Sequence, residues 1–327
     1  MSRESEAEDP ASRSRLFVMG GAHIDRRGRV AGRFVPGASN PGSMREEPGG
    51  GALNAARAAV QRGVHVSLMS LRGGDSTGEA VAAAIAASGI KDRSVTFLDR
   101  QTPSYTAILD DRGGLVAGLA DMALYDLFFA RQASRRATRD AVQAADSILL
   151  DANLPEEAIA RLVSHAGDRP VYGIAVSPAK VLRFAGVLPR IACLFLNGAE
   201  AAALGAAGSD AGALARLAQL GLKRAVMTRG AAGILCLDAG EMFSLAAPET
   251  SDIVDVTGAG DALAGATIAA LLRRLPFEAA VREGMAAAHL AIRDAAASPV
   301  LEPHTFAEVV GQLGPASRFD KLSETPT

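Results

Sequence analysis

Short apolar runs alternate with helix-forming segments along most of the chain. Runs typical of buried strands occupy residues 16–19, 64–71, 147–150, 171–176, 193–196, 225–227 and 234–237. Helix-forming segments occupy residues 53–62, 78–88, 155–166, 200–204, 211–220, 261–272 and 277–291. Strands that alternate with helices in this way form a mainly parallel sheet covered by helices. The pattern therefore predicts one large α/β domain.

Two stretches in the N-terminal half depart from this alternation. Residues 26–47 are rich in glycine, proline and charge, with no helical period, and residues 99–125 contain two short strand patterns around the turn Asp110–Gly114. The second stretch has the form of a β-hairpin. We expect the two to pair into a small β-rich lid on a domain that spans residues 16–316. Residues 1–15 and 317–327 are predicted to be flexible tails.

Composition narrows the class of protein. The chain has 327 residues, of which 49 % are hydrophobic and 21 % charged, and its formal net charge is −2. This balance gives no electrostatic reason to expect a nucleic-acid polymer or a membrane surface as partner. No apolar stretch approaches the ~18 residues of a membrane span, and the polar N-terminus does not resemble a secretory signal. A cytoplasmic protein is expected, with Cys193 and Cys236 as buried free thiols.

The strongest chemical signal is Asp255-Val-Thr-Gly-Ala-Gly-Asp261, directly before a long alanine-rich helix. Small residues at a helix start leave several backbone N–H groups free, and the positive end of the helix favours an anion. A carboxylate beside that anion suits phosphoryl transfer, which needs donors for the phosphate and a base for the attacking hydroxyl. The structural alternative is an N-cap aspartate that stabilises the helix by ~1 kcal/mol.

Three further patterns are weak when taken singly. Pro48-Gly-Gly-Gly51 opens a helix that carries Asn54, and glycines there allow close backbone approach to a ligand. Asn197-Gly-Ala-Glu200 follows a predicted strand, and so does Thr228-Arg-Gly-Ala-Ala-Gly233. Asp25 follows the first strand, where a turn carboxylate is the ordinary interpretation.

Together and in this order, the motifs resemble those of the PfkB/ribokinase family of ATP-dependent kinases. The resemblance implies a ribokinase-like three-layer α/β/α fold with a small lid, often dimeric through that lid. Asp261 would be the catalytic base, and the backbone of Gly258, Ala259 and Gly260 would form the anion hole. Asp25, Gly49, Gly50 and Asn54 would bind the sugar or nucleoside substrate. Asn197, Thr228, Gly230 and Gly233 would contact ATP, Glu200 would serve Mg²⁺, and Asp255 and Thr257 would hold a monovalent cation such as K⁺.

Several segments resemble the pseudouridine kinase branch more closely: Ser39-Asn40-Pro-Gly, residues 102–110, Ala120-Asp-Met and residues 176–180. This implies 5′-phosphorylation of pseudouridine, with Ser39 and Asn40 near the substrate and Thr106 lining the lid. The chain departs from the branch at four polar positions, which here are Leu53, Ala120, Ile174 and Phe195. Such changes can alter specificity or activity.

Other functions remain open at this point. A ribokinase-like or fructokinase-like sugar kinase would use the same chemistry on another acceptor. A non-catalytic ligand-binding relative would keep the fold without turnover. A dinucleotide-dependent oxidoreductase is excluded, because the first strand leads into Gly20-Gly-Ala-His-Ile-Asp25 rather than into a GxGxxG turn that opens a helix.

Overall fold

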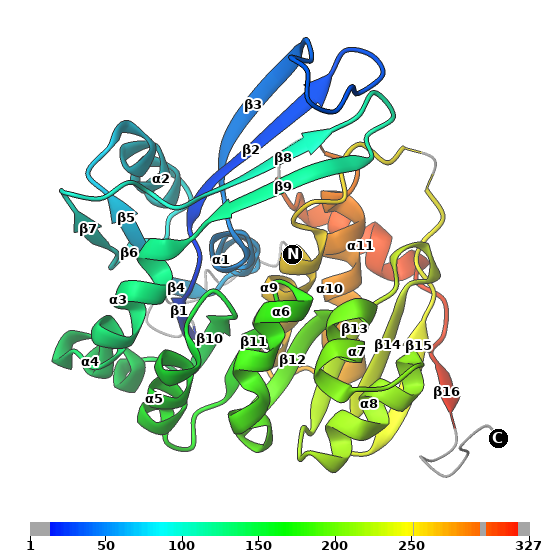
Figure 1. Ribbon diagram of the computed structural model, residues 1–327. Helices are drawn as coiled ribbons and strands as arrows, with labels where there is room; N and C mark the ends of the chain where they lie inside the picture. The colour runs from blue at the N-terminus through cyan, green and yellow to red at the C-terminus, as the bar shows by residue number, and fades with distance from the viewer. Residues whose placement is uncertain (1–13, 251, 295–298, 320–327) are drawn as a thin grey trace, which may run out of the picture.

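The computed structural model of this protein describes residues 14–250, 252–294 and 299–319. Within them, ten strands form one large sheet flanked by helices on both faces (Figure 1). The strand order across it is β16-β15-β14-β13-β12-β11-β10-β1-β4-β6. The strands are β1 (Arg15–Met19), β4 (His65–Met69), β6 (Lys91–Asp92), β10 (Ser147–Asp151), β11 (Val171–Ile174), β12 (Ile191–Asn197), β13 (Arg224–Thr228), β14 (Ile234–Asp238), β15 (Glu241–Leu245) and β16 (Ser317–Phe319). Pairing is parallel from β6 to β13 and antiparallel from β13 to β16. The predicted mainly parallel sheet is confirmed.

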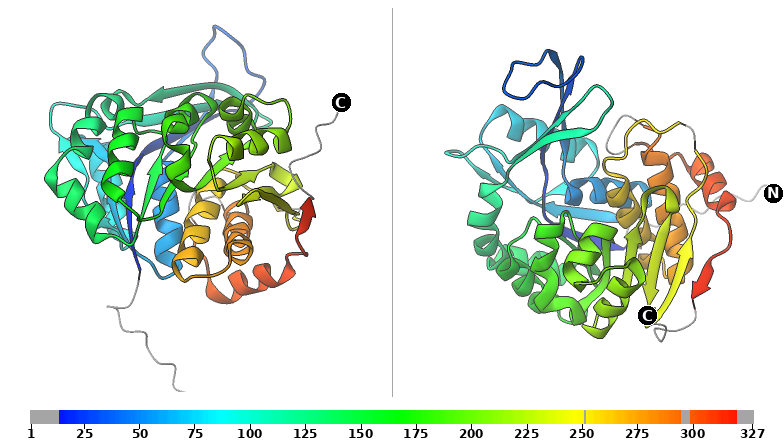
Figure 2. Two further views of the ribbon diagram at one scale, coloured as in Figure 1. Left: turned by 90° about the horizontal axis from the view of Figure 1, so that it is seen from below. Right: turned by 45° about the vertical axis from the view of Figure 1, so that its right-hand side comes forward.

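Helices cover the two faces of the sheet in separate groups, which Figure 2 shows from two further directions. One group is α1 (Gly51–Gln61), α2 (Ser76–Ala87), α9 (Ala259–Leu272) and α10 (Phe277–Ala291), with α11 (Pro303–Gln312) packed outside α10. The other group is α3 (Ala123–Ala133), α4 (Arg136–Ala144), α5 (Glu156–Ala166), α6 (Pro178–Val181), the 3₁₀ segment η2 (Leu182–Arg190), α7 (Gly198–Gly205) and α8 (Asp210–Gln219). The central sheet is therefore the middle of three layers.

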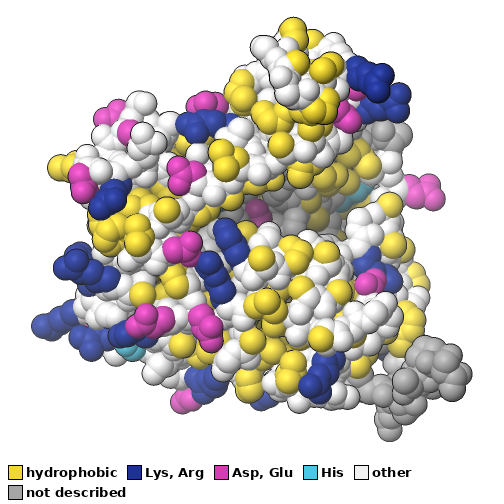
Figure 3. All heavy atoms as spheres, viewed as in Figure 1, with side chains coloured by type: hydrophobic (Ala, Val, Ile, Leu, Met, Phe, Trp, Pro, Cys, Tyr) yellow, Lys and Arg dark blue, Asp and Glu magenta, His cyan; other side chains and the backbone are white. Residues whose placement is uncertain are grey.

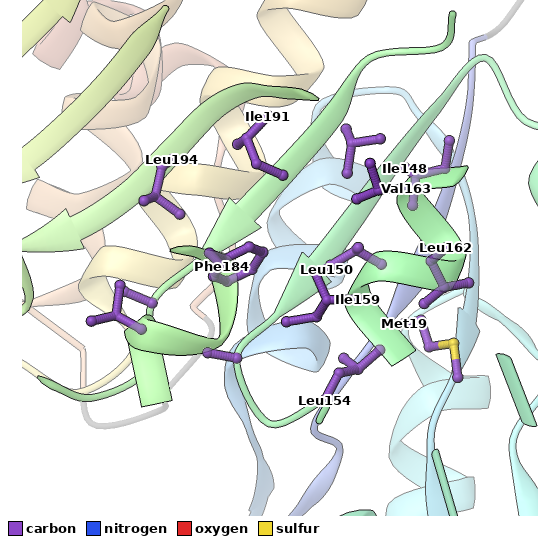
Figure 4. Close-up of a cluster of buried hydrophobic side chains, with 14 of the residues drawn as sticks. Met19, Ile148, Leu150, Leu154, Ile159, Leu162, Val163, Phe184, Ile191 and Leu194 are labelled. Atoms are coloured by element: carbon purple, nitrogen blue, oxygen red, sulfur yellow. The ribbon is translucent and has the colours of Figure 1, made fainter. Parts of the chain in front are cut away.

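The central strands are buried on both faces. All five residues of β10 are buried, as expected for a parallel strand between two helix layers. On one face, Ile148 and Leu150 pack with Ile159 and Leu162 of α5 (Figure 4). Burial of each such side chain contributes about 1.5–3 kcal/mol of transfer free energy. Within the described residues, every helix is too short or too polar to cross a bilayer.

Close packing of α9 against α1 positions the candidate site. A Cβ on Gly265 of α9 would lie 2.2 Å from the carbonyl oxygen of Ala55 and 2.9 Å from Cβ of Ala58, both on α1. The absence of a side chain at this glycine lets the two helices approach closely. Their first turns consequently lie side by side, which brings residues 54 and 261 together.

The lid is a separate four-stranded sheet in the order β3-β2-β8-β9. Its strands are β2 (His23–Val30), β3 (Gly42–Gly49), β8 (Ser104–Leu109) and β9 (Leu115–Asp121). β2 pairs in parallel with β8, so the two predicted excursions do join into one sheet. A smaller pair, β5 (Leu71–Gly73) with β7 (Val95–Phe97), lies beside α2. Figure 1 shows the lid extending above the edge of the large sheet.

Several elements differ from the sequence prediction. The helices α3, α4 and α11 and the strand β15 were not predicted, because their apolar positions are few or irregular. The prediction of a flexible tail from Ser317 is wrong for its first three residues. Ser317–Phe319 forms β16, where Arg318 pairs with Glu278 at 2.7 Å. The residues beyond 319, like those of the predicted N-terminal tail up to 13, lie outside the described residues. Cys193 and Cys236 are buried free thiols, as predicted, and burial raises the pKa of both.

Candidate active site

Two adjoining cavities lie where β11, β12 and β13 end and α9 begins. The smaller, of about 170 Å³, is lined by Asn197, Glu200, Thr228, Gly260 and Asp261 among others. The larger has about 580 Å³ and shares Thr228 and Gly260 with the first. Figure 3 shows the surface hollowed in the region beneath the lid. The carboxyl ends of parallel strands are the usual position of a ligand in such sheets.

Asp261 lies in the first turn of α9, after Gly258, which is the N-cap in a left-handed conformation with φ 78°. The first N–H groups of a helix have no partner within the helix and can bind an anion. Here the N–H of Ala259 lies 3.4 Å from the carbonyl oxygen of Val256, a long contact that an anion would replace. Desolvation of the carboxylate by burial raises the pKa of Asp261 to about 7; the hydrogen bond from Asn54 opposes the rise, and the charges of Asp151 and Asp25 add to it. A carboxylate with this pKa is suited to general-base work near neutral pH.

Asn54 connects α1 to this carboxylate. Its Nδ2 donates to Oδ2 of Asp261 over 3.1 Å, and its other amide atom, Oδ1, is buried without a hydrogen-bond partner. Buried polar atoms without a partner are rare, and a ligand often supplies the missing bond. Oδ1 is therefore positioned to accept a hydrogen bond from a hydroxyl group of a substrate.

The glycines before α1 are required by the close packing of this region. A Cβ on Gly49 would lie 2.2 Å from Oδ2 of Asp25, so a side chain there would displace that carboxylate. Gly50 has φ +104°, a conformation that favours glycine. A Cβ on Gly51 would lie 3.3 Å from Oδ1 of Asp261. This turn thus passes between Asp25 and Asp261.

Asp25 belongs to a buried polar chain. Its Oδ1 lies 3.3 Å from Nε2 of His23, whose Nδ1 lies 3.5 Å from the hydroxyl of Tyr125. That hydroxyl donates to the carbonyl oxygen of Ala22 and accepts from its N–H. Burial raises the pKa of Tyr125, so its hydroxyl stays protonated. The chain fixes the Asp25 carboxylate at the base of the lid.

Sequence reasoning missed Asp151, the last residue of β10. Its carboxylate is fully buried and accepts hydrogen bonds from the N–H groups of Gly21, Ala52 and Asn153 and from the side chain of Asn153. It holds the start of α1 against the turn that follows β1. The signal was a carboxylate at the end of an apolar run, Ile148-Leu-Leu-Asp151.

Asn197 and Glu200 form a reciprocal cap at the start of α7. Oδ1 of Asn197 accepts from the N–H of Glu200 at 2.9 Å, and Oε2 of Glu200 accepts from the N–H of Asn197 at 2.7 Å. Burial raises the pKa of Glu200. Within the described residues, no cluster of three or more His, Cys, Asp or Glu side chains is arranged to hold a metal. Glu200 and Asp261 both line the smaller cavity, and one or two carboxylates suit Mg²⁺ bound mainly through phosphates and water.

The larger cavity is lined by three of the four predicted ATP residues, Thr228, Gly230 and Gly233, and by apolar side chains; the fourth, Asn197, lines the smaller cavity. Gly230 and Gly233 line it, together with Leu263, Met285 and His289. Gly233 has φ +84°, and a Cβ there would lie 2.1 Å from the carbonyl oxygen of Leu245, so this turn requires glycine. The apolar walls suit a nucleotide base, and the glycine turn lets phosphates approach the backbone closely.

Some predicted residues lie apart from this cluster. Ser39 and Asn40 are in the connection between β2 and β3, and the side chain of Asn40 bonds only within it, to Val35 and Ala38. The lid register pairs Asp25 with Tyr105 and Arg26 with Thr106. Because side chains alternate along a strand, Tyr105 shares a face with Asp25 and Thr106 is on the opposite face. Thr106 therefore does not face the site in this chain. The prediction missed this because the strand register of the lid cannot be read from a local pattern.

Asp255 and Thr257, predicted as cation ligands, lie before α9. The carboxylate of Asp255 accepts from the N–H of Thr257 at 2.9 Å and is paired with Arg27 of the lid strand β2. Two of the four departures from the pseudouridine kinase pattern, Ile174 and Phe195, line the smaller cavity and make that wall apolar.

A lid sheet, a cavity and a carboxylate at a glycine-rich helix start are together typical of a phosphotransferase. The model of the pfkB family of carbohydrate kinases matches residues 13–303. The chain belongs to this family and is an ATP-dependent kinase of sugars or nucleosides.

Individual relatives agree with this assignment. The chain is 29 % identical over 283 residues to a pseudouridine kinase of Escherichia coli, covering 85 % of this chain and 90 % of that protein. A solved carbohydrate kinase from Agrobacterium tumefaciens is 42 % identical, with a TM-score of 0.82 and coverage of 94 % of this chain and 100 % of that one. An Arabidopsis thaliana ribokinase complexed with ribose and ATP has a TM-score of 0.78 at 19 % identity. The match covers 91 % of this chain and 99 % of that one. This last likeness shows the ribokinase-like fold.

Proposed function

We propose that the protein transfers the γ-phosphoryl group of ATP to the 5′-hydroxyl of pseudouridine. The central observation is the pairing of Asp261 with Asn54 in the first turn of α9. The choice of acceptor is supported by the segments at residues 39–42, 102–110 and 176–180 and by the similarity to the Escherichia coli pseudouridine kinase.

In the proposed reaction, the acceptor hydroxyl meets the γ-phosphate of ATP beside Asp261. The ribosyl hydroxyls dock on Asp25, the Gly49–Gly50 backbone and Oδ1 of Asn54. Asp261 takes the proton of the primary hydroxyl, whose oxygen forms a bond to the γ-phosphorus as the bond to the ADP oxygen breaks. Backbone amides of residues 258–260 stabilise the negative charge on the transferring group, and one such donor is typically worth about 3 kcal/mol.

Glu200 and Asn197 are the residues that would hold Mg²⁺, on the wall shared with Asp261. When bound there, the ion neutralises charge on the ATP phosphates. The apolar pocket around Leu263 and His289 takes the adenine ring. The lid excludes water, which would otherwise compete with the acceptor hydroxyl.

The outer face of the lid supports a further part of the proposal, a homodimer. Register places Leu119, Thr106 and Arg26 on one face with Met44, which is the face away from Asp25. Leu119 is 70 % exposed and Met44 is 52 % exposed. A second copy would cover these two exposed apolar side chains. Leu119→Glu should convert a dimer to a monomer in sedimentation. Leu98 is exposed outside the lid sheet, so Leu98→Glu should leave the dimer intact.

A substrate panel tests the acceptor. The protein is incubated with ATP and pseudouridine, uridine, ribose or fructose, and the products are identified by mass. The largest kcat/KM is expected for pseudouridine. A larger value for ribose or fructose would establish a sugar kinase instead. Transfer to none of the four would refute the proposed acceptors while leaving the fold assignment intact.

A further inference from the structure

An arginine of the lid contacts the segment that forms the anion hole. Nη1 of Arg27, on β2, pairs with Oδ2 of Asp255, although the two residues are 228 positions apart in the sequence. Both side chains are largely shielded, with 19 % and 26 % of their surfaces exposed. In Figure 1 the segment between β15 and α9 rises towards the lid. Arg27 lies two residues after Asp25 on the same strand and on the same face.

Each oxygen of the Asp255 carboxylate has a partner. Oδ1 accepts from the N–H of Thr257 at 2.9 Å, and Oδ2 faces Arg27. Nη2 of Arg27 lies 2.9 Å from Oε1 of Glu47 on β3, an ion pair without hydrogen-bond alignment. One guanidinium thus joins two lid strands to the residues directly before Gly258.

This arrangement does not fit the monovalent cation expected from the family resemblance. A guanidinium is charged at every pH at which a protein folds, and it already neutralises Asp255. A K⁺ ion on the same carboxylate would lie within a few ångströms of that charge and would be repelled by it. The carboxylate predicted as a cation ligand is therefore unsuited to that role in this chain.

We propose that Arg27 is a built-in replacement for the monovalent cation and acts as a positioning residue for the anion hole. By holding Asp255 it fixes the segment that ends in Gly258–Asp261, and the lid strand that carries it also carries the substrate ligand Asp25. Closure of the lid and assembly of the anion hole are then one event. The kinase requires no K⁺. The proposal rests on the kinase activity described above but not on the identity of the acceptor.

The first test compares the wild type with Arg27→Met and Arg29→Met, in potassium chloride and in tetramethylammonium chloride of equal ionic strength. Arg29 is the matched control, because it lies on the same strand and face but donates to the carbonyl oxygen of Asp111. The wild type and Arg29→Met should turn over equally in both salts. Arg27→Met should lose roughly tenfold or more in kcat/KM without K⁺, as expected for truncation of one partner of a shielded charge pair, and should regain much of it with K⁺.

A thermal-unfolding measurement without substrates gives an independent readout. Potassium should raise the Tm of Arg27→Met and leave that of the wild type unchanged. The double variant Arg27→Met, Asp255→Asn should lose the potassium response, because the carboxylate is gone. Arg27→Lys, which keeps the charge, should stay insensitive to potassium. A wild type that needs K⁺, or an Arg27→Met variant that responds to K⁺ no more than the wild type, would overturn the proposal even if the acceptor is not pseudouridine.

Discussion

Asn54 donates to Asp261 through Nδ2 over 3.1 Å and presents a buried, unpartnered Oδ1 next to it. The two residues come from the first turns of two helices that a glycine allows to pack closely. A single amide thus lowers the pKa of the base and offers an acceptor to a hydroxyl group.

Asp261→Asn should abolish most turnover. An amide cannot accept the proton of the acceptor hydroxyl, and loss of a general base typically lowers the rate by about 10²–10⁴. Because the binding groups of the lid are untouched, KM for the acceptor should change little. Steady-state kinetics with direct acceptor-binding measurements check this. A non-catalytic relative would show no turnover in the wild type either.

The pH profile of kcat/KM should rise as pH increases through about 7, because Asp261 must lose its proton before it can act as a base. Asn54→Ala should move this rise to higher pH, since the hydrogen bond from Asn54 lowers the pKa of Asp261. Titration of kcat/KM against pH in both proteins measures the displacement. An unchanged midpoint in Asn54→Ala would show that Asn54 does not lower the pKa of Asp261.

Asp151→Asn should shift the same rise to lower pH, because the negative charge of Asp151 raises the pKa of Asp261. It should also destabilise the fold. In the wild type the N–H groups of Gly21 and Ala52 donate to Oδ2 of Asp151, and in the variant they would face an amide group. The cost expected for one unsatisfied buried group is about 1–3 kcal/mol in the free energy of unfolding. Urea unfolding and the pH profile measure the two effects. Asp140→Asn, on the exposed surface of α4, serves as control.

Asp261 itself should reduce stability at neutral and alkaline pH. Its pKa is about 7 in the folded protein and 3.8 in the reference state, so between these values the folded state binds a proton that the unfolded state does not. Stability therefore falls as pH rises through this window. Asp261→Asn lacks the effect and should have a higher Tm than the wild type above pH of about 7. The Tm difference between the variant and the wild type should shrink in acid. A difference of the same size in acid and above neutral pH would contradict a raised pKa at Asp261.

Gly49→Ala should weaken acceptor binding selectively. The added methyl group would lie 2.2 Å from Oδ2 of Asp25 and must displace that carboxylate. A shift of about 1 Å in a binding group can cost roughly tenfold to a hundredfold, here in KM for the acceptor. The KM for ATP should stay nearly constant. Gly32→Ala, where no atom lies within 4 Å of the added Cβ, is the matched control.

Much of the fold could be predicted from apolar periodicity. Every predicted strand from Leu16 to Leu237 has its counterpart, and the helices that carry Asn54 and Asp261 begin within three residues of the predicted starts. Local chemistry also suffices for the Asn197–Glu200 cap, because both residues lie in one helical turn. These features depend on neighbours in the sequence.

The rest depended on contacts between distant segments. The sequence by itself determined the parallel sheet, the glycine turns and the helix start that carries Asp261, since turn conformation and the period of apolar residues depend on neighbours in the chain. Only the tertiary structure decided that Thr106 turns away from Asp25, that Asp151 supports α1, and that Arg27 forms an ion pair with Asp255. Strand register and ion pairing across 228 residues leave no local pattern, because their energies arise only once the chain has folded.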